Sequence, residues 1–318
     1  MKSGYVGRLA PSPTGALHLG NVRTFMVAWL RARQAGGRLI LRTEDLDHPK
    51  HKAGAADQAV EDLKWLGFDW DEEHVQSSRT EHYAAAIRKL HSEGLAYPCV
   101  CSRRDVEAAQ SAPHEGDQLH YPGTCRDRFA SWEEAYGFLN PEFSDDGRQP
   151  RLPCWRFQIP DGATVSFTDG FAGEYSMDVG VKLGDFPLAR DKNGAGYTLA
   201  VVVDDAEMGV TEVVRGDDLL PATPQQILVY RALGLDAPSF FHVPLVTGPD
   251  GRRLAKRHGD TRISSFREGG MKAEDIIGYL ARSLGILQKK KPVGLRALTG
   301  MFDPACVPRG PLVFEGFT

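Results

Sequence analysis

The sequence predicts an α/β fold with a parallel sheet at its centre and an insertion in its middle third. Val6–Ala10 is a short apolar run of strand length, and a segment rich in proline and glycine follows it. Over His18–Ala35 the apolar residues then recur with helical spacing. Residues 99–195 differ, because they hold short strand-like pieces between turns and four of the five cysteines. The first pattern resumes after residue 195, so we expect one core that the insertion interrupts.

The turn after the first predicted strand is the main candidate binding site. The following helix directs its free backbone N–H groups into the crevice at the end of the strand, which favours an anion there. His18 and Gly20 lie where this helix begins. An imidazole can donate to phosphate oxygens, and a glycine lets a flat base approach the backbone. A histidine that merely caps the helix is the alternative, but the preceding Pro-Ser-Pro-Thr-Gly run favours a functional site.

Acidic residues gather at the end of the second predicted strand, Arg38–Asp45. Its run Leu39–Leu41 is continuously apolar, which indicates a strand covered on both faces. If the strands are parallel neighbours, Glu44 and Asp47 lie beside the first crevice, where a carboxylate could bind a substrate ammonium. The alternative is a solvated acidic turn, which competes more strongly for Asp47 than for Glu44.

Composition excludes several classes of protein. The chain has 318 residues and a net charge of −4, so any contact with nucleic acid depends on local basic patches. No stretch has the roughly 20 apolar residues of a membrane span, and the N-terminus has no apolar run followed by a cleavage site. The five cysteines are unevenly spread, unlike a secreted disulfide framework. We expect a soluble, cytoplasmic monomer that does not bind membranes.

Three thiols mark the start of the insertion: Cys99, Cys101 and Cys125. In a reducing compartment they favour a tetrahedral zinc site with one further ligand. On chemistry alone, the favoured candidates for that ligand are the nearby histidines His114 and His120. Tyr121 is a third candidate, although tyrosine is an unusual zinc ligand. Buried reduced cysteines without a metal are the alternative, because Cys-x-Cys is less specific than paired Cys-x-x-Cys. Cys154 and Cys306 lie far away in the sequence and are interpreted as structural.

The remaining elements follow from hydrophobic patterns. Helices are predicted before the insertion over Ala53–Leu66 and Thr80–Glu93, and after it over Pro224–Leu233 and Met271–Leu287. Strand-like runs within the insertion are Trp155–Ile159, Thr164–Thr168 and Gly173–Ser176, and those after it are Tyr197–Asp204, Val210–Arg215 and Phe241–Val246.

Two groups of basic residues in the second half are candidate ligand contacts. Arg215 ends a predicted strand, where open parallel sheets place ligand-binding residues, and its guanidinium would suit a carboxylate. Pairing with Asp217 or Asp218 is an alternative of near-equal weight. The loop 248–259 contains the cations Arg252, Arg253, Lys256 and Arg257, which could hold phosphate or could simply be solvated.

Two separated signatures resemble those of class I aminoacyl-tRNA synthetases. Pro11–Asn21, with His18-Leu19-Gly20-Asn21, resembles the first signature, and Arg253-Leu254-Ala255-Lys256-Arg257 resembles the second. The runs RLAPSPTG and RTEDLD are similar to the glutamyl branch. The resemblance covers about residues 4–290, and no large anticodon-binding region follows. A short glutamyl-type core with this cysteine pattern resembles the glutamyl-queuosine tRNA(Asp) synthetase family.

The resemblance implies a Rossmann-type catalytic domain in two halves, 1–98 and 196–247, around a zinc-bearing insertion, 99–195. A signature loop with a helical segment, 248–290, and a tail, 291–318, complete the chain. The implied reaction is activation of L-glutamate by ATP with Mg²⁺, without tRNA, and its transfer to the queuosine base at the wobble position of tRNA(Asp). Lys256 and His18 are the implied catalytic residues.

The resemblance also assigns ligands residue by residue. Glutamate contacts are implied for Arg8, Leu9, Ala10, Pro11, Ser12, Glu44, Tyr197 and Arg215. ATP contacts are implied for His18, Gly20, Asn21 and Lys256. One structural Zn²⁺ per chain is implied at Cys99, Cys101, Tyr121 and Cys125, so the family pattern selects the tyrosine over the histidines.

This sequence departs from the family signatures at three positions. Asn21 stands where the first signature has histidine, Arg253 stands where the second has lysine, and Ala255 replaces its serine. Loss of the serine hydroxyl removes one donor to phosphate, so activation could be slow. Two other functions stay open: a truncated synthetase that charges tRNA(Glu), and a non-catalytic RNA-binding paralogue.

Overall fold

A five-strand parallel arrangement forms the centre of the computed structural model, which describes residues 4–46, 51–109, 120–141, 149–252, 254 and 260–317. Three strands pair in the order β1 (Val6–Leu9), β2 (Arg38–Thr43) and β3 (Glu72–Val75), and β9 (Glu212–Gly216) pairs with β10 (Ser239–Val243), all in parallel. The groups join where the Thr211 N–H donates to the Val6 carbonyl over 2.9 Å. The predicted parallel sheet is therefore confirmed.

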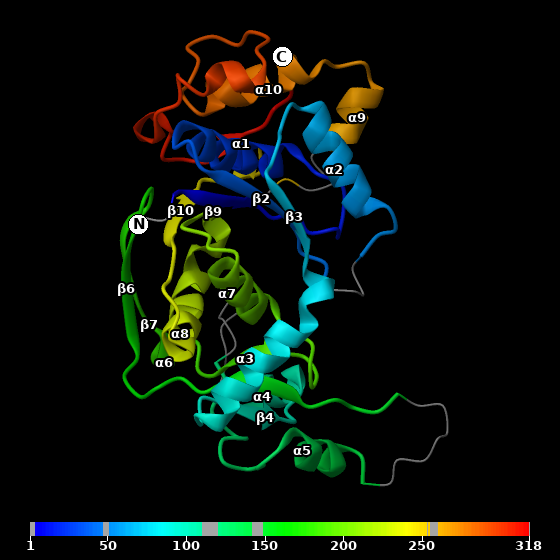
Figure 1. Cartoon of the computed structure of the whole chain (residues 1–318), viewed down its shortest axis with the longest axis vertical. Coiled ribbons are helices and arrows are strands. Elements are labelled where there is room, and N and C mark those ends of the chain that lie inside the picture. Colours follow the sequence, from blue (N-terminus) through cyan, green and yellow to red (C-terminus); the bar gives the residue numbers. More distant parts are fainter. Residues whose placement is uncertain are drawn as a thin grey trace.

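Helices cover both faces of this sheet. On one face, α1 (Leu19–Gln34) packs with Leu9, Leu39 and Leu41 in one hydrophobic core. On the other face, Val6 and Ile40 belong to a second hydrophobic core. The helices of this second core are α3 (Thr80–Ser92), α7 (Tyr197–Glu207) and α8 (Thr223–Leu233). Burial on both sides explains why the run over β2 is continuously apolar. The first core also includes α2 (Ala55–Trp65) and α10 (Ala273–Ser283), and α9 (Ile263–Glu268) lies beside α2 (Figure 1).

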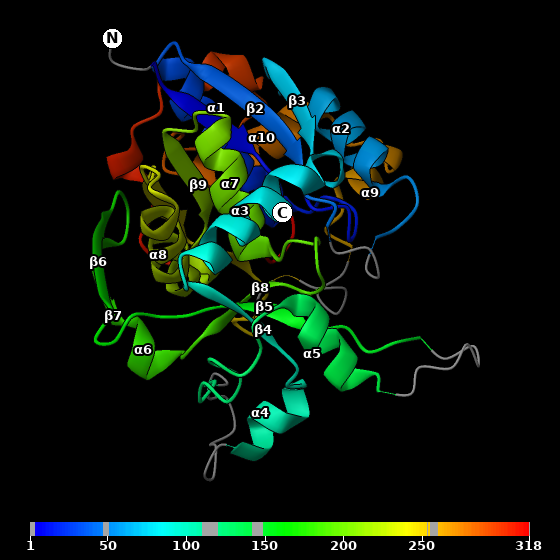
Figure 2. The same cartoon turned by 60° about the horizontal axis from the view of Figure 1, so that its bottom comes forward.

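The insertion has its own antiparallel sheet, β4 (Ala96–Cys99), β5 (Cys154–Phe157) and β8 (Phe186–Ala189). Figure 1 shows β4, α4 (Arg103–Ala109) and α5 (Trp132–Leu139) at the opposite end of the molecule from α1 and α10. A hairpin, β6 (Thr164–Asp169) with β7 (Gly173–Asp178), precedes the short helix α6 (Val179–Lys182). The hairpin reaches back to the central sheet, where the Gly170 N–H donates to the Phe240 carbonyl over 2.8 Å. Figure 2 shows this hairpin beside α8.

The prediction of a strand over Tyr197–Asp204 is wrong, because the segment lies in helix α7. Its consecutive valines and lack of alternation resemble a strand buried on both faces. Residues Leu199–Asp205 are all buried, however, and a helix buried on all sides shows no amphipathic period. Tertiary packing therefore overrides the local β propensity of the valines.

The end of the chain packs on the strand that precedes the basic loop. Strand β12 (Leu312–Val313) pairs in parallel with β11 (Val246–Thr247), and the Phe314 N–H donates to the Thr247 carbonyl over 2.8 Å. Short 3₁₀ helices η5 (Leu295–Leu298) and η6 (Pro304–Cys306) lead to it. Among the described residues, none of the helices has the length and apolar character needed to cross a bilayer. Met271–Leu287, predicted as one helix, is helical only over α10.

Candidate active site

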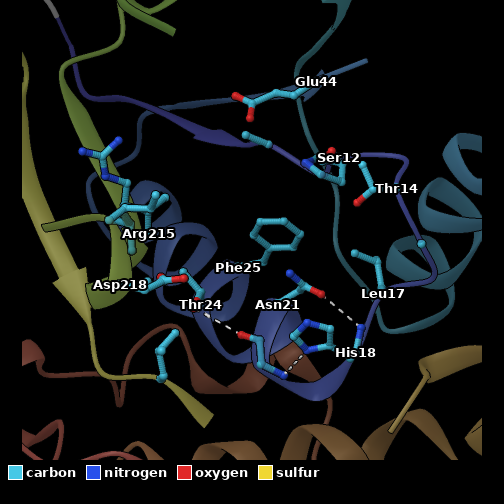
Figure 3. A pocket seen from close by; sticks show the side chains of 18 of the residues that line it. Ser12, Thr14, Leu17, His18, Asn21, Thr24, Phe25, Glu44, Arg215 and Asp218 are labelled. Atoms are coloured by element: carbon cyan, nitrogen blue, oxygen red, sulfur yellow. Dashed lines mark hydrogen bonds between the residues drawn. The ribbon is translucent and has the colours of Figure 1, made fainter. Parts of the chain in front are cut away.

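A cavity of about 460 Å³ opens where β1 and β9 end and α1 begins. Figure 3 shows Glu44 and Arg215 at one end of it and His18 and Asn21 at the other. The predicted ligand contacts that line it are Arg8, Ala10, Pro11, Ser12, His18, Gly20, Asn21, Glu44, Tyr197 and Arg215. The Leu9 side chain instead is fully buried in the hydrophobic core. Residues up to 207 positions apart in the chain, Arg8 and Arg215, thus share one cavity with two chemically different ends.

The first end is the N-terminus of α1, which a reciprocal cap holds in place. His18 Nδ1 accepts the Gly20 N–H over 3.1 Å, and Asn21 Oδ1 accepts the His18 N–H over 3.1 Å. Because Nδ1 is an acceptor, the neutral imidazole carries its proton on Nε2. A side chain on Gly20 would come within 2.9 Å of the His18 ring. Asn21 therefore holds the His18 backbone, and the Gly20 N–H holds the His18 ring.

The segment that follows the basic loop packs beside this end. The Leu19 N–H donates to the Thr261 carbonyl over 3.2 Å, and the Ile263 N–H donates to the Leu17 carbonyl over 2.9 Å. On the other side of the basic loop, Leu245 and Val246 line the cavity. Described residues on both sides of the loop, Val246 and Arg262, thus lie beside the N-terminus of α1. Arg253, Ala255, Lys256 and Arg257 lie outside the described residues.

The other end of the cavity rests on a buried network of charges. Arg8 donates to the Val214 carbonyl over 2.7 Å and lies 3.8 Å from the Asp205 carboxylate. The Nε atom of Arg8, which is the atom nearest to Asp205, is buried and has no hydrogen-bond acceptor among the described residues. Fully buried Arg42 donates to Asp205 over 2.6 Å and to Glu44 over 3.0 Å. Asp205 and Arg42 thereby hold both cavity residues, Arg8 and Glu44.

Glu44 is not a solvated turn residue, since its side chain is only 13% exposed. Burial raises its pKa above the ordinary value, while the Arg42 and Arg8 guanidinium groups oppose that shift. A carboxylate held in this way can accept hydrogen bonds from an ammonium group. Asp47, its predicted neighbour, lies outside the described residues.

Arg215 is held by three side chains that sequence reasoning did not connect with it. Its Nε donates to His242 over 3.0 Å, its Nη2 to Thr223 over 2.8 Å, and its Nη1 to the Tyr197 hydroxyl over 3.4 Å. The alternative of pairing with Asp217 or Asp218 is thus replaced by contacts within the protein interior. The guanidinium stays beside the cavity and keeps donors for an anionic ligand.

A second cluster of side chains lies in the insertion. The Cys99, Cys101 and Cys125 sulfurs are all within 4.8 Å of one another, and the Tyr121 hydroxyl lies 3.3 Å from Cys99 and 3.6 Å from Cys101. Tetrahedral zinc with bonds of about 2.3 Å places its ligands about 3.8 Å apart. The donor set therefore fits a metal ion. His120 Nε2 lies instead 2.9 Å from the Gly180 carbonyl, and His114 lies outside the described residues.

Two neighbours of this cluster were not predicted. Cys154 is opposite Cys99 in the β4–β5 pairing, so it adjoins the thiols although it lies far from them in the sequence. Arg156 donates to the Cys99 sulfur over 3.2 Å, and its guanidinium carbon lies 3.8 Å from the centre of the Tyr121 ring. If a metal ion is bound, a cation there would stabilise its anionic sulfur and oxygen ligands. The sequence did contain a sign of the role of Arg156, since an arginine lies inside the apolar strand CWRF.

Other functional positions also escaped sequence reasoning. They are the buried polar residues that hold cavity side chains: Arg42, Asp169, Asp205, Thr223 and His242. An arginine in RLILRT and a histidine in SFFHV are charged or titratable groups inside apolar strands, and this irregularity is the only local sign of a role.

The comparisons with known proteins agree with this geometry. Residues 5–296 match the family described as tRNA synthetases class I (E and Q), catalytic domain. The chain is 47% identical to the glutamyl-Q tRNA(Asp) synthetase of Symbiobacterium thermophilum over 96% of this chain and 94% of that protein. It is 49% identical to that of Rhodopirellula baltica, over 90% and 87%.

A solved structure shares the fold. It is a glutamate tRNA ligase from Elizabethkingia meningosepticum in complex with its amino acid, with a TM-score of 0.81 and 28% identity over 98% of this chain and 67% of that chain. Fold and cavity thus define a class I tRNA synthetase catalytic domain. Within that class, the chain belongs to the glutamyl-Q tRNA(Asp) synthetase family.

Proposed function

We propose that this enzyme activates L-glutamate with ATP, without tRNA, and transfers it to the queuosine base at the wobble position of tRNA(Asp). The observation that carries the proposal is the cavity with two ends. Arg8, Arg215 and Glu44 lie at one end, and the N-terminus of α1 with His18 lies at the other. An amino acid with an acidic side chain would thus lie next to a nucleotide phosphate. The similarity to named glutamyl-Q tRNA(Asp) synthetases supports the acceptor.

In the first half-reaction, an α-carboxylate oxygen of glutamate attacks the α-phosphorus of ATP. The new P–O bond forms in line with the bond to the β-phosphate, which breaks and releases pyrophosphate. No enzyme nucleophile is required, so catalysis comes from positioning and from cations that meet the developing charge. The His18 Nε2–H, the N-terminus of α1, Lys256 and the Mg²⁺ that accompanies ATP supply that stabilisation.

Recognition of glutamate uses opposite charges. Arg8 and Arg215 bind the side-chain carboxylate, and Glu44 accepts from the ammonium group. Tyr197 and the backbone from Ala10 to Ser12 close the same end of the cavity. In the second half-reaction, a hydroxyl of the queuosine diol attacks the glutamyl carbonyl and AMP leaves.

The experiment that tests the acceptor uses purified enzyme with ATP, Mg²⁺ and labelled glutamate. Three tRNAs are compared: tRNA(Asp) with queuosine, tRNA(Asp) without it, and tRNA(Glu). We expect label on queuosine-containing tRNA(Asp) alone. Label on tRNA(Glu) would support the truncated-synthetase alternative and contradict the proposal. Absence of both label and pyrophosphate exchange would support a non-catalytic RNA-binding paralogue.

We also propose that Cys99, Cys101, Tyr121 and Cys125 hold one structural zinc ion. Four protein ligands leave no open position for water, so the metal would support the fold of the insertion and take no part in catalysis. The neighbouring Arg156 would offset the negative charge of the ligands.

Cys101→Ser is expected to lower zinc content well below one ion per chain and to lower the melting temperature by several degrees, because metal binding contributes directly to folding. Zinc analysis by mass spectrometry and thermal unfolding of the same sample measure both. Cys306→Ser is the matched control, since Cys306 is exposed and remote from the cluster. A Cys101→Ser protein with full zinc and unchanged melting temperature would contradict the site.

A further inference from the structure

Three side chains on separate strands form a buried chain of hydrogen bonds that ends at the cavity. Asp169, the last residue of β6, lies with its Oδ2 2.6 Å from His242 Nδ1. His242 Nε2 accepts from Arg215 Nε over 3.0 Å, and the two residues are register partners on β10 and β9. The exposed fractions of Asp169 and His242 are 2% and 0%. Neither side chain lines the cavity, so both act on it only through Arg215.

The hydrogen bonds determine where the protons lie. Arg215 Nε always carries a proton, so His242 Nε2 must be an acceptor. The proton of the neutral imidazole is therefore on Nδ1, where it is donated to Asp169. The other oxygen of Asp169, Oδ1, accepts three backbone N–H groups, from Phe171 over 2.9 Å, Ala172 over 2.8 Å and His242 over 3.2 Å. The orientation of the carboxylate is thus fixed independently of the histidine.

We propose that Asp169 and His242 are positioning residues that select the His242 tautomer needed to orient the Arg215 guanidinium toward the substrate carboxylate. The inference rests on the proposed function, in which Arg215 binds glutamate. With Nε held by His242 and one Nη2 proton by Thr223, rotation of the guanidinium plane is blocked. The remaining N–H groups keep a fixed direction, which a bidentate contact with a carboxylate requires.

The hairpin of the insertion supplies this control from outside the Rossmann-type core. Its turn is held tightly against β10, because a side chain on Gly170 would come within 2.7 Å of the Phe241 ring. The Gly170 N–H also bonds the Phe240 carbonyl. Asp169 is therefore presented to His242 by a rigid contact between the hairpin and the sheet.

Asp169→Asn tests the tautomer directly. Oδ1 faces only backbone donors, so the amide oxygen takes that position and the amide NH₂ is forced to face His242 Nδ1. His242 then becomes the acceptor at Nδ1 and carries its proton on Nε2, against Arg215 Nε–H. Asparagine has the same shape as aspartate, so this substitution selects the wrong His242 tautomer and removes no side chain. We expect the KM for glutamate in pyrophosphate exchange to rise about 10-fold or more, with the KM for ATP unchanged.

A pair of His242 variants separates hydrogen bonding from packing. Glutamine places an acceptor oxygen near the Nε2 position, whereas asparagine places its amide near Nδ1 and leaves Arg215 without an acceptor. His242→Gln should therefore retain a KM for glutamate about 10-fold closer to wild type than His242→Asn. If His242 had only a structural role, the KM for glutamate would not depend on whether the new side chain offers Arg215 an acceptor. The pair decides the matter if Asp169→Asn does not fold.

Asp62→Asn is the matched control, because Asp62 is an equally buried carboxylate on α2 that bonds Gln58. It should leave both KM values unchanged. The inference is overturned if the wild-type enzyme is active but Asp169→Asn, or both His242 variants, keep the wild-type KM for glutamate. If the wild-type enzyme shows no glutamate-dependent exchange at all, the proposed function itself fails.

Discussion

The Arg215→Lys enzyme is expected to need about 100-fold more glutamate for half-maximal pyrophosphate exchange. Lysine is also cationic, but its ammonium cannot reproduce a planar fork that is held at His242, Thr223 and Tyr197. The substrate carboxylate would lose its bidentate partner, and His242 would lose its donor. The KM for ATP should stay within about twofold, since the nucleotide end of the cavity is unchanged.

The control for this substitution is Arg33→Lys. Arg33 also makes a forked contact, with Asp69 over 3.1 Å and Asp71 over 2.9 Å, but it lies near the C-terminal end of α1, away from the cavity. It should leave both KM values as in the wild type. A KM for glutamate within threefold of wild type in a folded Arg215→Lys protein would show that Arg215 does not bind the substrate.

Lys256→Ala should lower the maximal rate of pyrophosphate exchange about 100-fold or more, the usual effect of removing one donor to developing charge. The described flanks of the loop support this expectation. Gly248 closes the start of the loop by donating to the Arg252 carbonyl over 2.9 Å, and Leu254 donates to the Val246 carbonyl over 3.3 Å. Leu254, two residues before Lys256, is therefore bonded to a strand that lines the cavity.

The melting temperature of Lys256→Ala should be that of the wild type, because the residue is expected to act on phosphate and not on packing. Lys182→Ala, on the insertion helix α6, removes an exposed lysine elsewhere and should not alter exchange. Near-normal exchange by Lys256→Ala would remove this residue from the mechanism and revive the idea that the altered second signature has lost its function.

The cysteine cluster illustrates what local sequence can and cannot predict. The close spacing of Cys99 and Cys101 and the nearby Cys125 predicted the thiols that meet in the structure. The place of Cys154 beside Cys99 depends on the antiparallel pairing of β4 with β5, two strands separated by a long segment. Such pairing is a property of the folded chain, and no spacing rule reveals it.

The sequence by itself determined the parallel α/β core, the turn before α1, the positions of Arg8, His18, Glu44 and Arg215, and the family. These features are local, since strand-turn-helix patterns and signature runs are written in adjacent residues. Only the tertiary structure decided that Tyr197–Asp204 is helical, because full burial erases the period that distinguishes helix from strand. It also brought together the side chains that hold the cavity residues in place: Arg42, Asp205, Asp169 and His242. Hydrogen bonds between distant strands depend on the packing of the sheet and leave no periodic trace in the chain.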